Sequence, residues 1–178
     1  MSRWKARVAV LISVLAMAAP ANAQQPPVLE NGGLGKVRIG MGIKEAERAI
    51  GARLRSLIPA YGPGCWLAVR ADGIDPGLSY MVENGLITRI DIGTPRGGAA
   101  PATSTAKGIG VGSTATDVER TYGGGNSAPA PYGHDDGDRW IAVERTPTLG
   151  IVIAMSGGKV VGMWAGRRDS IAYTEGCS

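Results

Sequence analysis

Two stretches of the chain share one pattern of hydrophobic and polar positions. In the first, apolar residues at positions 43, 46, 49 and 50 recur on one helical face, and the run closes on Gly51, which suits a left-handed helix end. Alternation with a period of two then predicts strands at 66–71, 78–83 and 86–92. The second stretch predicts a helix closing on Gly123 and strands at 140–145, 151–155 and 159–165. Each stretch therefore predicts one helix followed by three strands.

The two stretches also match residue by residue. Segment 39–51 aligns without a gap on segment 111–123, and the strand that starts at Trp66 matches the one that starts at Trp140. The period is too long, and the copies too few, for a solenoid. A tandem duplication is predicted, with units at 36–93 and 107–166 and a linker at 94–106 that is rich in Pro, Gly, Ala and Thr.

The expected fold class is α+β: two tandem helix–β–β–β units with antiparallel sheets and the helices packed on one face. Strand alternation places Trp66, Trp140, Val152, Val160 and Trp164 on the face away from the helices. Such an apolar, aromatic face is a candidate binding surface, unless the linker or the C-terminal tail covers it or the two faces are reversed. The core face receives Leu67, Val69, Leu78, Tyr80, Val82, Leu86, Ile90 and Ile92 in the first unit, and Ile141, Val143, Ile151, Ile153, Val161 and Met163 in the second.

The N-terminus has the organisation of an export signal. Arg3, Lys5 and Arg7 precede an apolar run at 8–19, and Ala21-Asn22-Ala23 follows as a cleavage site. Residues 1–23 are predicted to be a signal peptide, so the mature chain is periplasmic or secreted. It would consist of an N-terminal segment at 24–35, the two units and a tail at 167–178. No later run approaches the 18 apolar residues of a membrane span, so no transmembrane segment is expected in the mature protein.

Removing the signal peptide changes the charge balance. The 178 residues contain 19 Lys and Arg against 15 Asp and Glu, and cleavage removes three of the basic residues. The mature chain is then nearly neutral, which argues against nucleic acid as a partner because phosphate binding needs clustered positive charge.

Cys65 and Cys177 are the two cysteines of the chain. In an oxidising compartment they are predicted to form a disulfide that ties the tail to the first unit, the alternative being two free thiols. Closing a loop of this length stabilises the fold by about 4–5 kcal/mol in the chain-entropy model.

Candidate catalytic chemistry is sparse. The single histidine, His134, lies beside Asp135, Asp136 and Asp138, a group that could bind a divalent cation. The competing interpretation is a solvated loop in front of the Trp140 strand. We expect no cofactor, no metal site and no enzymatic activity.

The layout resembles a known family. Ile39-Gly40-Met41, the run from Glu45 to Gly51, Trp66 and Asn84-Gly85, with their second-unit partners, look like the SmpA/OmlA (BamE-like) unit. Two such units in tandem are similar to the β-lactamase inhibitor protein fold. The lipid-attachment cysteine of the BamE-like proteins is missing, and the cysteine pattern differs from that of the inhibitor fold. The binding residues of the inhibitor lie outside the matched motif, so none of them is carried over.

Three functions follow as hypotheses. The first is a non-catalytic binding module of the cell envelope that acts through the open sheet face, with a protein as partner or, alternatively, a carbohydrate. The second, implied by the resemblance alone, is a secreted inhibitor of a hydrolase such as a β-lactamase or a protease. The third is a metal-dependent enzyme that uses the His134 loop.

Overall fold

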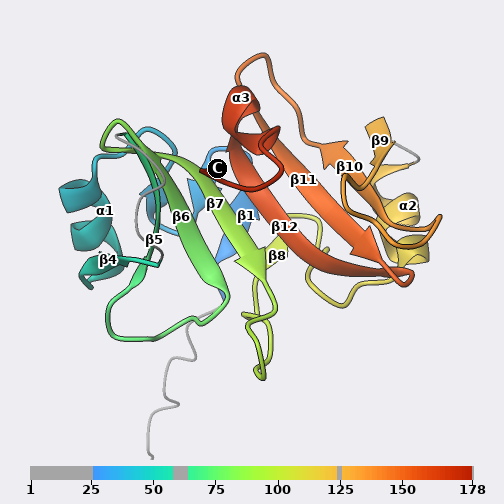
Figure 1. The fold of residues 1–178 in the computed structure, drawn as a ribbon, viewed down its shortest axis with the longest axis horizontal. Coiled ribbons are helices and arrows are strands. Elements are labelled where there is room, and N and C mark those ends of the chain that lie inside the picture. Colours follow the sequence, from blue (N-terminus) through green and yellow to red (C-terminus); the bar gives the residue numbers. More distant parts are fainter. Residues whose placement is uncertain (1–25, 58–63, 124–125, 178) are drawn as a thin grey trace, which may run out of the picture.

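The computed structural model describes residues 26–57, 64–123 and 126–177. A large antiparallel sheet has the strand order β4-β5-β6-β7-β12-β11-β10-β9, and a small sheet has the order β3-β2-β1-β8. Figure 1 shows the small sheet behind the middle of the large one, with α1 and α2 toward its two ends. The elements are β1 (Val28–Glu30), β2 (Gly33–Leu34), β3 (Val37–Arg38), α1 (Ile43–Ile50), β4 (Leu54–Ser56), β5 (Cys65–Arg70), β6 (Leu78–Glu83), β7 (Leu86–Gly93), β8 (Ser104–Thr105), α2 (Ala115–Tyr122), β9 (Asn126–Pro129), β10 (Arg139–Val143), β11 (Leu149–Ser156), β12 (Lys159–Arg167) and α3 (Arg168–Ile171).

The predicted fold class is wrong. The protein is mostly β, with 42% strand and 14% helix, and it is not built from helix-packed α+β units. The prediction failed because the segments at 24–35 and 94–106, predicted to be an N-terminal segment and a linker, supply strands of the small sheet, in which β1 pairs with both β2 and β8. Leu29 of β1 is fully buried in the core. The small sheet therefore covers the large one where the helices were expected to do so.

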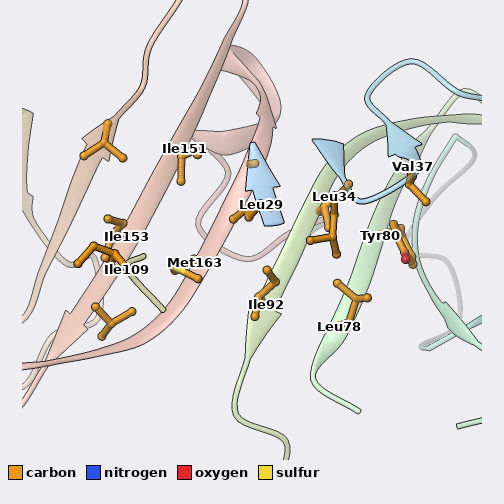
Figure 2. Packing of buried hydrophobic residues seen from close by; sticks show 14 of the residues in the cluster. Leu29, Leu34, Val37, Leu78, Tyr80, Ile92, Ile109, Ile151, Ile153 and Met163 are labelled. Carbon is orange, nitrogen blue, oxygen red and sulfur yellow. The ribbon is translucent and has the colours of Figure 1, made fainter. Parts of the chain in front are cut away.

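One hydrophobic core fills the space between the two sheets. Leu29 and Leu34 of the small sheet cluster with Tyr80, Ile92 and other buried residues of the large sheet. Figure 2 shows these side chains pointing into the same layer. The helices lie where the apolar spacing predicted them, at Ile43–Ile50 and Ala115–Tyr122.

The two halves of the chain occupy equivalent places in the large sheet. Each half runs inward from an outer strand, β4 or β9, and the halves meet where β7 pairs with β12. Val82 pairs with Ile87 as Met155 pairs with Val160, so equivalent strand positions are 73 residues apart. The duplication and its unit boundaries stay predictions.

A β-bulge at the same place in each half changes which side chains reach the core. The ladder between β6 and β7 skips Thr88, and the ladder between β11 and β12 skips Val161. An extra residue reverses the alternation of faces beyond it. Leu86 and Val161, predicted in the core, are therefore 42% and 45% exposed. Val160, predicted on the face away from the helices, is 1% exposed and belongs to the core.

The side chains of β5 point to the opposite faces of the sheet from those predicted. Trp66 pairs with Val82 and packs against the core, so it faces the small sheet rather than the open side. Leu67, predicted in the core, pairs instead with Met81, which alternates with the core residues of β6. The sequence similarity of Trp66 and Trp140 hid this difference, because the equivalent of Trp66 in the large sheet is Arg139.

Candidate functional site

The face of the large sheet opposite the small sheet, here called the open face, carries a pair of tryptophans. Trp140 lies opposite Ala154 on the neighbouring strand, and Val152 lies opposite Trp164. The two indole rings meet edge to face, with centroids 4.8 Å apart and an interplanar angle of 81°. Both tryptophans are half-buried. The small side chain of Ala154 leaves room for the rings to lie against each other across β11.

Trp164 is held in place by polar contacts as well as by packing. Its indole Nε1 donates a hydrogen bond to the carbonyl oxygen of Ile171 at 2.9 Å. The guanidinium of Arg89 lies 5.8 Å from the centre of the ring, within the range of a cation–π interaction. These contacts fix the orientation of Trp164, and its ring therefore loses little freedom when a partner binds.

The C-terminal residues 168–177, here called the C-terminal strap, lie across part of the open face. The strap begins with α3 and ends in the disulfide between Cys65 and Cys177, whose Cα atoms are 5.4 Å apart. The predicted disulfide is confirmed. In Figure 1 the red α3 turn lies in front of the large sheet, near its middle. One of the predicted alternatives, coverage by the tail, thus holds for the part of the face around β7 and β12.

A buried arginine organises the strap. Arg89 of β7 contacts the carboxylate of Asp91 through two nitrogens, at 3.1 and 2.9 Å. Its Nη1 donates to the carbonyl oxygens of Ser170 and Tyr173, both at 3.0 Å. Hydrogen bonds from a charged donor are each worth about 1.5–3 kcal/mol. Arg89 was not singled out from the sequence. The signal for it is an arginine two residues from an aspartate within a largely apolar strand.

Glu83 provides a second polar link between sheet and strap. Its carboxylate accepts hydrogen bonds from the hydroxyls of Thr88 and Ser170. Burial is the largest single influence and raises the pKa of Glu83, but the hydrogen bonds from Ser170, Thr88 and Tyr173 and the charge of Arg167 together outweigh it, so the pKa lies below its usual value. The ionised form of Glu83 is therefore the form that holds the strap.

Three of the five predicted face residues come together. Trp140, Val152 and Trp164 share the open face, with Val152 buried between the flanking strands. Trp66 and Val160 belong to the core side, because of the reversed strand and the bulge.

The His134 loop reaches the strap but has the contacts of a structural turn. The carboxylate of Asp138 accepts from the backbone N–H groups of His134 and Asp135, and the bond from His134 contributes most to holding the pKa of Asp138 below its usual value. Within residues 26–57, 64–123 and 126–177, no group of three or more His, Cys, Asp or Glu side chains is placed to hold a metal ion. Tyr132, at 65% exposure, donates from its hydroxyl to Glu175 of the strap.

Comparison with known proteins shows the fold alone. No family model matches the chain, and no curated protein matches it. Among solved structures, the uncharacterized protein yfeY from Escherichia coli is similar with a TM-score of 0.51 and 17% identity, over 79% of this chain and 99% of that one. In the part of the chain that the structure describes, no helix is long and apolar enough to cross a membrane.

Proposed function

We propose that this chain is an exported, non-catalytic binding module of the cell envelope, and that a protein partner contacts the Trp pair. The observation that carries the proposal is the edge-to-face pair of Trp140 and Trp164, half-buried on the side of the sheet away from the small sheet. Tryptophans held rigidly on a partly exposed surface are the residues most enriched at binding hot spots. The role proposed for them is to anchor side chains of the partner.

The surroundings of the Trp pair favour a protein over a sugar. The rings stand at 81° to each other, so they form a corner rather than a flat platform on which a sugar ring would stack. The strap borders this corner through Ile171, and its Tyr173 is 43% exposed. Two aromatic rings that form a corner suit an inserted loop, because they bury a large area at small cost in entropy.

Export is supported by the signal-like N-terminus, which lies outside the described residues, and by the disulfide. Disulfides persist in oxidising compartments, and the proposed location is therefore the periplasm or the exterior of the cell. N-terminal sequencing of the exported protein is expected to begin at Gln24. A retained Met1 on a cytosolic protein would contradict this part of the proposal.

Capture from a periplasmic extract with the mature protein as bait tests the binding role. Trp140→Ala is the informative variant, since among the described residues the indole bond to the strap comes from Trp164 rather than Trp140. It is expected to abolish capture while lowering the free energy of unfolding by about 1 kcal/mol. Leu86→Ala, an exposed apolar position in the first half, is the matched control and is expected to leave capture intact.

The results separate the hypotheses. A captured envelope protein lost only with Trp140→Ala supports the binding module, and a captured β-lactamase or protease supports the inhibitor hypothesis. Retention on a polysaccharide instead of a protein would identify a carbohydrate partner. Equal capture by both variants, or a loss of about 3–5 kcal/mol with Trp140→Ala, would mean that the tryptophans are structural.

A further inference from the structure

A cavity of about 230 Å³ lies between α2 and the outer strands of the second half, on the side of the large sheet opposite the Trp pair. Figure 1 shows α2, β9 and β10 together at this end of the molecule. Its apolar floor is formed by Ile141 and Met155, which are 9% and 3% exposed. Ala115, Glu119 and Arg139 are among the residues that surround it.

The cavity exists because two large apolar side chains of the first half have no counterpart in the second. The position equivalent to Trp66 in the large sheet is Arg139, since Trp66 pairs with Val82 as Arg139 pairs with Met155. The first residue of α1 is Ile43, whereas the first residue of α2 is Ala115. Ile43 and Trp66 both pack against the core.

The equivalence of the halves indicates what shape the cavity accepts. In the first half an indole ring and a branched aliphatic side chain pack against the core at these positions. In the second half one is replaced by an exposed arginine and the other by a methyl group. Interiors are close-packed, and an open volume above an apolar floor is typical of a ligand pocket. A planar aromatic group is the natural occupant.

The charged residues around the cavity have no ionic partner of their own. Neither Glu119 nor Arg139 forms an ion pair with any residue in the described part of the chain. Arg139 makes one long hydrogen bond, from Nε to the carbonyl oxygen of Gly137 at 3.4 Å. A guanidinium with free donors favours a carboxylate, and a free carboxylate favours an ammonium group.

We propose that this cavity binds a free aromatic amino acid. Its ring would lie on Ile141 and Met155, its carboxylate would pair with Arg139, and its ammonium group would pair with Glu119. The aromatic ring accounts for the missing indole, and the zwitterion accounts for two unpaired charges of opposite sign at one cavity. This site is independent of the Trp pair and does not rest on the proposed function.

Calorimetric titration of the mature protein with L-tryptophan, L-phenylalanine and uncharged indole tests the proposal. Saturable binding of the amino acids is expected, with indole weaker by at least about tenfold because it cannot make the charged contacts. Ala115→Ile refills the cavity as in the first half and is expected to weaken binding at least about tenfold. Thr116→Ile, the same change at an exposed neighbour that does not line the cavity, is expected to leave binding unchanged.

Charge is tested separately by Arg139→Gln, with Arg145→Gln as the control outside the cavity. The first is expected to weaken amino-acid binding at least about tenfold without affecting indole, and the second to leave both unchanged. Backbone amide shifts on adding L-tryptophan to the wild-type protein are expected to cluster on α2 and β10, which keeps the test valid if a variant fails to fold. No saturable binding at millimolar ligand, unchanged binding by Ala115→Ile, or shifts confined to the Trp pair would overturn the proposal.

Discussion

Replacing Arg89 by methionine removes the charge at the centre of the strap while keeping most of the side-chain volume. The substitution deletes both contacts to Asp91 and both bonds to the carbonyls of Ser170 and Tyr173. Breaking a buried ion pair by removing one partner costs about 3–5 kcal/mol. Because the Asp91 side chain keeps 24% of its exposure and water can reach it, we expect the lower end, about 3 kcal/mol.

The chain offers a matched control for this experiment. Arg70 and Asp72 have the same spacing and the same two-nitrogen geometry, at 3.1 and 2.7 Å, but the third hydrogen bond of Arg70 goes to the carbonyl oxygen of Ile50 rather than to the strap. Its side chain is 15% exposed and that of Asp72 38%, so Arg70→Met is expected to cost about 1 kcal/mol.

Urea denaturation gives the two free energies of unfolding, and hydrogen exchange of the strap amides reports its docking. We expect Arg89→Met to speed exchange across residues 170–176 and Arg70→Met to leave it unchanged. Equal losses of stability in the two variants, or a strap that stays protected without Arg89, would refute the role assigned to this arginine.

Three further perturbations test the same region. Cys177→Ser in a background with Cys65→Ser is expected to lower the free energy of unfolding by up to about 5 kcal/mol, the chain-entropy value for a loop of 112 residues. Non-reducing peptide mapping of the wild type checks the pairing, and free thiols in the folded protein would contradict it. The pKa of Glu83 is lower in the folded protein than in the unfolded chain, so ionised Glu83 stabilises the fold above its unfolded pKa, and this stability is lost as pH falls through its folded pKa. Glu83→Gln should therefore reduce the dependence of strap hydrogen-exchange protection on pH in the acid range. An unchanged pH profile would exclude this link. Gly166→Ala should unfold or strongly destabilise the protein, because a Cβ there would lie 2.3 Å from a backbone carbonyl oxygen, whereas Gly93→Ala, with nothing within 4 Å of its Cβ, should be tolerated in the same thermal-melting assay.

Elements with a strong hydrophobic period or a recognisable end signal could be predicted from the local sequence. The apolar spacing located both eight-residue helices, and Thr114 and Asp117 form a reciprocal capping box at the start of the second. The disulfide was predicted because the chain has two cysteines and a predicted export signal, and an oxidising compartment favours their pairing. The helices and the capping box depend on neighbours in the chain, and the disulfide had only one possible pairing, so all of them could be predicted.

Features set by contacts between distant segments could not be predicted. The small sheet is built from strands of two or three residues, too short to show a period, and it forms because Leu29 and Leu34 find a core to fill. The skipped residues Thr88 and Val161 leave no mark on the alternation, yet each reverses the faces beyond it.

The candidate site divides in the same way. Trp140 and Trp164 were expected on the open face from alternation alone, and the structure places them there in contact. Strand pairing across the large sheet decided the rest. It turns Trp66 toward the core, brings Arg89 to the strap and places Arg139 where the first half has an indole. Sequence determined which side chains were available; the register between strands, fixed by burial over the whole sheet, decided which of them meet.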